Sequence, residues 1–146
     1  MTEVRSFNVH RKYRIRHKEI QKLVRLVLTN ERIRHVAVNV VFVDDRKMTD
    51  LNGTYLNHWY RTDVLSFPLE EKYTRSLGGE VYVNLDQAYR QSKEYRVTFA
   101  SEKARLVVHG VLHLVGYSDA TKTLRSRMAA LEDKYLVKFG LPLSRK

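Results

Sequence analysis

The chain has 146 residues, with 27 Lys and Arg against 16 Asp and Glu, and a formal net charge of +11. This length suits one domain, residues 1–146, with a sizeable core. The absence of cysteine excludes disulfides and thiolate metal sites, and it fits a reducing compartment. No apolar run reaches the length of a membrane span and no signal peptide is evident, so we expect a cytoplasmic protein with no membrane partner.

The positive charge is concentrated near the N-terminus. Residues 1–34 hold ten Lys and Arg against three acidic residues, so +7 of the net charge lies there. Such a bias favours a polyanion as partner, although a membrane surface or solubility alone would also account for it. For any one of these cations a solvated surface position is the simpler interpretation. Together they form a candidate patch for tracking phosphates.

Hydrophobic periodicity predicts four strands and five helices, in the order strand, helix, strand, helix, strand, strand, helix, helix, helix. Along the chain they are expected at 6–10 (strand), 20–28 (helix), 35–43 (strand), 44–51 (helix), 64–67 (strand), 80–84 (strand), 84–95 (helix), 99–115 (helix) and 121–139 (helix). In the first strand, Phe7 and Val9 alternate with polar residues. The helix at 99–115 is apolar nearly all round and should be the buried central one. The order indicates a single α+β domain with a small sheet.

Certain residues are expected to end these elements. Candidate N-caps precede three helices: Asp44 or Asp45, Asn84 or Asp86, and Thr98. Residues 51–60 read as a loop, with Asn52-Gly53 as a turn, and residues 69–77 read as a second loop. Pro68 should lie at a strand end or a sheet edge, because proline has no amide hydrogen to donate to a neighbouring strand.

The predicted central helix carries two histidines at a metal-binding spacing. His109 and His113 stand four residues apart, so their imidazoles project from one helix face and can chelate one ion. Gly116 lies where a glycine ends a helix in a left-handed turn, and a reversal there brings Asp119 back towards the histidines. Two imidazoles and one carboxylate leave coordination positions open, as in catalytic metal sites. The alternative is a pair of buried, hydrogen-bonded core histidines.

Gly110 lies between the two histidines. A glycine inside a helix costs about 1 kcal/mol relative to alanine, so a reason for it is expected. Either a substrate or a strand passes close to the metal, or the helix simply packs tightly. In the zinc-protease motif His-Glu-x-x-His, a glutamate in this place is the general base. Gly110 has no side chain to accept a proton, which argues against a peptidase.

Three sequence blocks resemble one known family. Residues 109–117, HGVLHLVGY, resemble the signature of the YbeY family, the single-domain metal-dependent endoribonucleases of bacterial rRNA maturation. Residues 62–68, TDVLSFP, and residues 77–83, LGGEVYV, resemble two further family blocks in the expected order. The resemblance extends from about Phe42 to Phe139. It implies a mixed four-stranded sheet packed with about five helices, in a zinc-hydrolase-like fold.

The resemblance also implies the residues of a site. It implies one divalent ion, expected to be Zn²⁺, with three protein ligands: His109, His113 and Asp119. The family has a third His where this chain has Asp119, which adds negative charge and should lower the Lewis acidity of the ion. A family arginine is replaced by Leu56. The candidate catalytic residues are Arg61, which can neutralise phosphate charge, and Ser66, which can contact substrate. A surface arginine and a buried strand serine are the alternatives.

The function implied is a single-strand-specific endoribonuclease for rRNA precursors, at the 3′ end of small-subunit rRNA, and for ribosome quality control. RNA and the ribosome are the implied partners, with ribosomal proteins or a GTPase as further ones and no DNA. Zinc can lower the pKa of a bound water to about 7. Attack by hydroxide and attack by a ribose 2′-hydroxyl both stay open. The alternatives are an RNA- or ribosome-binding module with a structural metal, and a metallohydrolase of another substrate.

Overall fold

The computed structural model describes residues 2–56, 62–70 and 77–143. These residues form four strands and five helices in the predicted order. Their bounds are β1 Glu3–Asn8, α1 His17–Asn30, β2 Ala37–Val43, α2 Asp45–Leu56, β3 Val64–Glu70, β4 Leu77–Asn84, α3 Leu85–Glu94, α4 Phe99–Leu114 and α5 Lys122–Lys138. The predicted α+β class is confirmed.

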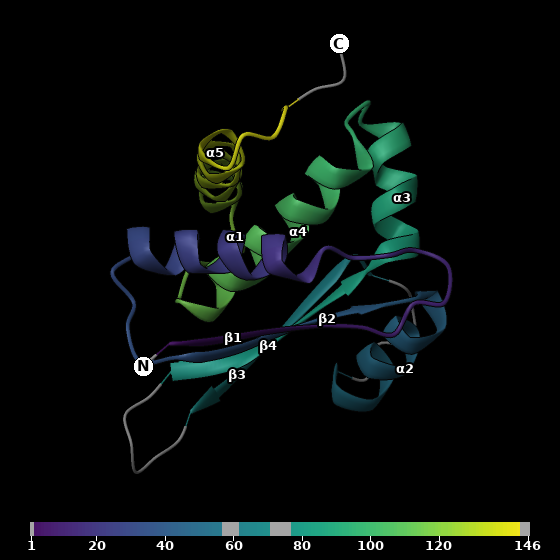
Figure 1. Cartoon of the computed structure of the whole chain (residues 1–146), viewed down its shortest axis with the longest axis horizontal. Coiled ribbons are helices and arrows are strands. Elements are labelled where there is room, and N and C mark those ends of the chain that lie inside the picture. Colours follow the sequence, from purple (N-terminus) through teal and green to yellow (C-terminus); the bar gives the residue numbers. More distant parts are fainter. Residues whose placement is uncertain (1, 57–61, 71–76, 144–146) are drawn as a thin grey trace.

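The four strands form one mixed sheet in the order β1-β2-β4-β3. Strand β2 runs parallel to both β1 and β4, whereas β3 runs antiparallel to β4. Helices α1, α3, α4 and α5 lie on one side of the sheet, and α2 lies on the other (Figure 1). Strand β3 is therefore an edge strand that lies beneath one side of α4, and β1 forms the opposite edge.

Helix α4 is the centre of the fold, as its apolar composition predicts. It contacts α1, α3, α5, β3 and β4. The Thr98 side chain caps it by accepting a hydrogen bond from the amide of Ser101, as predicted. Asn84 caps α3 in the same way, by accepting from the amides of Asp86 and Gln87. Within the described residues, no helix combines the length and the apolar character that crossing a membrane requires.

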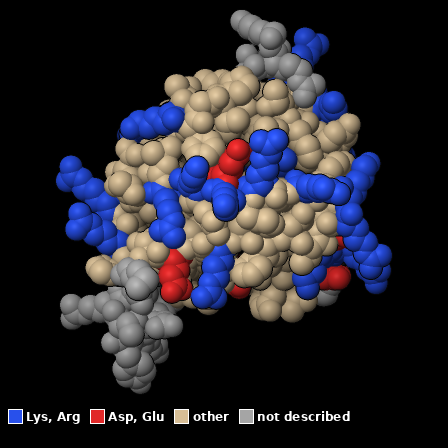
Figure 2. All heavy atoms as spheres, in the orientation of Figure 1, with Lys and Arg blue, Asp and Glu red and all other residues tan. Residues whose placement is uncertain are grey.

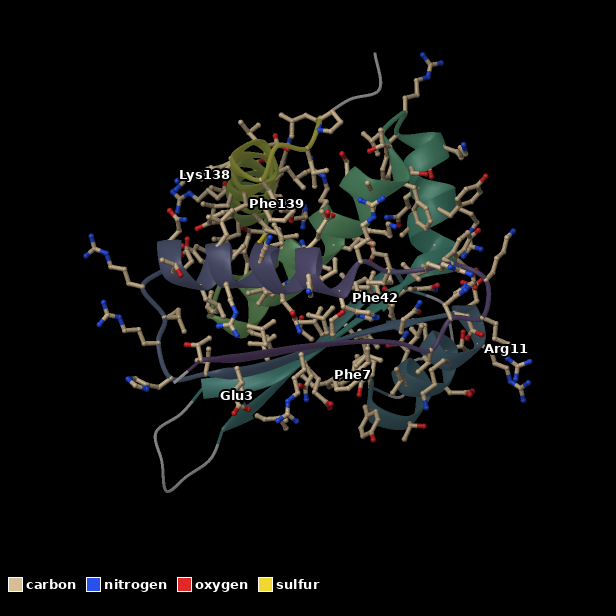
Figure 3. The ribbon with its side chains drawn as sticks, viewed as in Figure 1. Glu3, Phe7, Arg11, Phe42, Lys138 and Phe139 are labelled. Carbon is tan, nitrogen blue, oxygen red and sulfur yellow. The ribbon has the colours of Figure 1, made fainter. Side chains whose placement is uncertain are left out.

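The predicted register of the first strand is wrong. Val4 is 5% exposed and faces the core, whereas Phe7 is 46% exposed and Val9 lies beyond the end of β1. Phe42 of β2 lies between the sheet and the helices, and Phe7 lies on the other side of the sheet (Figure 3). Because side chains alternate faces along a strand, an error of one residue exchanges the buried and exposed sets.

The predicted loop at 51–60 is also wrong for its first part. Helix α2 continues to Leu56, and Asn52 and Gly53, the predicted turn, are buried inside it. Met48 and Leu51 are buried on the same helix, and this packing outweighs the local turn preference of Asn and Gly. Residues 57–60 lie outside the described part of the chain.

Strand β3 continues past Pro68 to Glu70, further than predicted. Pro68 is paired with Gly79 of β4, and β3 is the last strand in the sheet that the described residues form. The prediction that Pro68 occupies a sheet edge is confirmed, because an edge strand tolerates a missing amide hydrogen. The predicted loop at 69–77 is shorter than expected at both ends, and residues 71–76 lie outside the described part.

Candidate metal centre

Helix α4 ends in a glycine turn that reverses the chain. The amide of Gly116 donates to the carbonyl of His113 at 3.1 Å, and the amide of Tyr117 donates to that of Leu112 at 3.0 Å. These two bonds define a Schellman motif. Gly116 has φ +108°, a backbone conformation that residues with a side chain rarely adopt. The predicted role of Gly116 is confirmed.

The turn brings three candidate ligand atoms together. Nε2 of His109 and Nε2 of His113 lie 3.1 Å apart, and each lies 3.4 Å from Oδ2 of Asp119. These three side chains form a cluster able to hold a metal ion, the only such group of three or more found among the described residues. The two histidines and the aspartate singled out in the sequence therefore meet at one point.

The spacing of these atoms fits a tetrahedral ion. Ligand atoms at about 2.0–2.1 Å from a tetrahedral zinc ion lie about 3.3–3.4 Å from one another, close to the observed 3.1–3.4 Å. The side chains of His109, His113 and Asp119 are 22%, 29% and 41% exposed. Solvent and a substrate can therefore reach the cluster, as a catalytic site requires.

Glu132 of α5 orients the first histidine. Its carboxylate lies 2.6 Å from Nδ1 of His109. A carboxylate accepts hydrogen bonds, so Nδ1 carries the proton and donates, and Nε2 is left with its lone pair facing His113 and Asp119. This carboxylate–histidine pairing is common behind metal-binding histidines. It sets both the tautomer and the ring orientation that a metal ion needs.

Glu132 is itself held in place from α4. Nη1 of Arg105 donates to Glu132 at 3.2 Å, and Nη2 of Arg105 donates to Asp133 at 2.6 Å. Burial lowers the pKa of His109. The hydrogen bond and charge of Glu132 and the charges of Asp119 and Asp63 raise it by more than burial lowers it, so the pKa lies above its ordinary value. A positive ion at this position is therefore electrostatically favoured.

Comparison with known proteins identifies the family. The family model described as endoribonuclease YbeY matches residues 5–140. The chain belongs to the endoribonuclease YbeY family. An endoribonuclease YbeY of Chlorobium phaeovibrioides is 37% identical over 126 residues, covering 86% of this chain and 84% of the relative. One of Salinibacter ruber is 44% identical over 106 residues, covering 68% of each chain. The resemblance seen in the sequence is thus confirmed.

The fold is also found in a solved structure. A solution structure of a Thermotoga maritima protein matches with a TM-score of 0.61 at 25% identity, and the match covers 94% of this chain and 91% of that one. The mixed four-stranded sheet and five helices of this YbeY-family chain therefore have a counterpart determined independently.

Gly110 of this YbeY-family chain lies against the sheet. A Cβ atom at this position would overlap Cγ1 of Val81 and lie 3.2 Å from Oγ of Ser66. This contact is tight packing of the helix, the second of the two expected reasons for the glycine. Ser66 donates its hydroxyl hydrogen to the carbonyl of Gly110 at 2.8 Å. Ser66 thus holds the helix segment that lies between the two histidines.

Two further positions singled out in the sequence were Arg61 and Leu56. Arg61 lies outside the described residues, and Leu56, at the position of the family arginine, is an exposed residue at the end of α2. Conversely, the sequence interpretation did not identify Glu132 or Arg105. The sequence pattern could have indicated Glu132, which lies on the same helix face as the buried Met128 and Tyr135 of α5. A carboxylate buried on an apolar helix face needs a polar partner.

Proposed function

We propose that this member of the endoribonuclease YbeY family cleaves single-stranded RNA with one divalent metal ion held by His109, His113 and Asp119. The observation that carries the proposal is the solvent-reachable triangle of three ligand atoms 3.1–3.4 Å apart. Family membership supports RNA as the substrate, and the net charge of +11 is suited to a polyanion. We further propose rRNA precursors on the ribosome, in the cytoplasm, as its target.

Zinc is the ion we propose. Two imidazoles and tetrahedral spacing suit zinc, although a carboxylate ligand also accepts harder ions. When bound in such a site, zinc lowers the pKa of a water to about 7 and polarises a phosphoryl oxygen. Asp119 in place of the family's third histidine adds a negative charge. This charge should hold the ion more firmly and reduce its power to polarise the substrate.

The protein residues have separate tasks in this proposal. Glu132 keeps the proton of His109 on Nδ1, so that Nε2 remains a ligand. Ser66 acts as a positioning residue, because its hydroxyl is engaged with the Gly110 carbonyl. Arg61 is proposed to neutralise phosphate charge. With Gly110 packed on Val81, helix α4 offers no carboxylate in the place of a protease base, and this favours a phosphodiester over a peptide substrate.

Metal content is the first measurement that tests the proposal. Elemental mass spectrometry on the wild type, Asp119→Ala and Asp50→Ala should show near-stoichiometric zinc in the wild type and in Asp50→Ala, and a clear loss in Asp119→Ala. Asp50 is an exposed carboxylate on α2 and serves as the matched control. A folded wild type that takes up no divalent metal, or equal metal in all three, would refute the three-ligand site.

A second measurement separates an enzyme from an RNA-binding module with a structural metal. His113→Ala should abolish cleavage of a single-stranded rRNA precursor while the circular dichroism spectrum and the RNA affinity stay close to those of the wild type. The chain has a core outside the site, so the fold should survive loss of the metal. If His113→Ala unfolds the protein, the metal is structural and the binding-module alternative is favoured.

A further inference from the structure

A second cationic region lies on the side of α1. The segment before α1 and the outer face of the helix carry exposed cations, which we call the α1 basic face: Arg11, Lys12, Arg14, Arg16, Lys18, Lys22 and Arg25. Lys18, Lys22 and Arg25 follow one another at the spacing that places side chains on one helix face. Figure 2, in which α1 faces the viewer, shows many Lys and Arg side chains across this surface, with a few acidic side chains among them.

These cations have few partners of opposite charge. In the described part of the chain, one ion pair involves them, Arg16 with Glu19 at 3.7 Å between largely exposed groups. Arg25 donates to the carbonyl of Thr2. An exposed pair of this kind contributes little stability. The remaining charge of the α1 basic face is therefore available to an external anion.

A cavity of about 720 Å³ adjoins this face, between the start of α1, the start of α4 and the end of α5. Its apolar lining includes Ile20 and Phe139. Its charged lining comprises three cations, Arg14, Arg16 and Lys103, and one carboxylate, Glu19, which is paired with Arg16. Phe139 lies at the end of α5 above α1 (Figure 3). Burial and the charge of Arg16 lower the pKa of Lys103, and the charge of Glu19 opposes this effect only in part. The three cations therefore outweigh Glu19 in the lining.

The cavity and the metal centre lie on opposite sides of α4. Ala100 and Ala104 line the cavity, and His109 and His113 each follow one of them by nine residues. Nine residues of an α-helix turn about 900°, which places the two pairs on opposite faces. A ligand in the cavity is therefore separated from the metal by the helix itself.

We propose that the α1 basic face and its cavity form a second RNA-binding site, in which phosphates contact the cations and one base enters the cavity. The inference rests on the proposed function in taking RNA as the ligand. Clefts of about 300–1,000 Å³ hold small ligands of nucleotide size, and Phe139 supplies an aromatic ring on which a base can stack. A combination of cations with an apolar, aromatic hollow fits a single-stranded nucleic acid better than it fits a simple anion.

The charge component is tested by fluorescence anisotropy with a labelled single-stranded RNA. All proteins carry Asp119→Ala, so that binding is read without cleavage and independently of the nuclease activity. The test variant adds Arg14→Gln, Lys18→Gln and Lys22→Gln; the control adds Arg46→Gln, Lys47→Gln and Lys93→Gln, exposed cations of α2 and α3. Each removes three charges. Three lost phosphate contacts should weaken binding about tenfold or more and reduce the salt slope by about 2.

The control variant should lose less than about twofold in affinity. Equal losses in both variants would refute a localised site. If the test variant instead loses binding to anionic phosphatidylserine vesicles and keeps its RNA affinity, the face binds membranes and the proposal is wrong. Because cleavage is not measured, failure of this proposal is distinct from failure of the proposed nuclease.

The cavity is tested by filling it without a change of charge. Ala100→Leu, in the first turn of α4, keeps a good helix former while it occupies part of the cavity. Loss of one stacked base should weaken single-stranded RNA binding about fivefold or more, while affinity for heparin, a polyanion without bases, stays unchanged. Equal RNA affinity with and without the Ala100→Leu substitution, at unchanged thermal stability, would refute entry of a base.

Discussion

The metal centre and the α1 basic face differ in how their residues are held. At the metal centre, His109 is engaged by Glu132, and Glu132 by Arg105, through contacts of 2.6 and 3.2 Å. On the α1 basic face, the cations extend into solvent, with one long ion pair among described residues. A metal ion requires ligand atoms placed to within a few tenths of an ångström, whereas a phosphate chain requires only a density of positive charge.

This difference predicts two patterns of mutational sensitivity. At the metal centre, single substitutions should have large effects that do not add, because the side chains form one connected network. On the α1 basic face, single substitutions should have small and nearly additive effects. Substitutions of the metal ligands should therefore be the most damaging, and single substitutions on the α1 basic face the least.

His113→Ala should have the largest effect. Removing a direct ligand should reduce metal affinity by more than about a hundredfold, because loss of an outer partner alone costs about 10- to 100-fold. RNA cleavage should fall with it. Isothermal titration with zinc measures the change, with His17→Ala, an exposed histidine at the start of α1, as the control. Unchanged zinc affinity in His113→Ala would show that the histidine pair is not a ligand pair.

Glu132→Gln should follow. The amide keeps the size of the side chain but loses the charge that fixes the proton on Nδ1 of His109, and metal affinity should fall about 10- to 100-fold. Asp133→Asn is the matched control. Asp133 is the neighbouring carboxylate and is paired with Arg105, so its loss should change metal affinity far less. Equal effects of the two would mean that Glu132 acts only through general charge.

The pH dependence of metal binding should also report the effect of Glu132 on His109. Zinc binds neutral imidazole, so protons compete with it as the pH falls. Although burial lowers the pKa of His109, the contact with Glu132 raises the net pKa above its ordinary value, so competition should begin at a higher pH than for an ordinary histidine. In Glu132→Gln the onset should move to lower pH. Zinc titrations across the pH range measure it; an onset that does not move would contradict the role of Glu132.

Gly110→Ala should lower the stability of the fold, although the three metal ligands are unchanged in this variant. The added methyl group would overlap Val81 and crowd Ser66, and overpacking of this kind costs about 1–3 kcal/mol. Thermal unfolding followed by circular dichroism should show a reduced Tm. Gly116→Ala provides the comparison, since its cost is backbone strain at φ +108°, and no atom of the described residues beyond its chain neighbours lies within 4 Å of the added Cβ. A Gly110→Ala protein as stable as the wild type would contradict the close packing of α4 on β4.

Lys22→Gln should have the smallest effect. The loss of one of several exposed cations should weaken RNA binding only about two- to fivefold at moderate salt and leave zinc affinity unchanged. Anisotropy and zinc titration on the same sample check both expectations. A hundredfold loss from this single substitution would show that the α1 basic face is as precisely arranged as the metal centre.

Much of the local structure was predictable because local rules decide it. The caps at Asn84 and Thr98 and the glycine turn at Gly116 follow from the chemistry of single residues, and all three are observed. The errors occurred where packing decides. The buried face of β1 and the length of α2 depend on which neighbours cover them, and nothing local in Asn52-Gly53 indicates that these residues are buried within a helix.

The element order, the metal-binding spacing of His109 and His113 and the likeness to the YbeY family could all be inferred from the sequence. These depend on periodicity and on residues close together in the chain. The folded chain was needed to show that Glu132, 23 residues after His109, orients that histidine, and that a cavity lined by three cations and Glu19 lies on the opposite side of α4. Both arise from the packing of α5 and α1 on α4, and contacts between segments far apart in sequence leave no local pattern from which to read them.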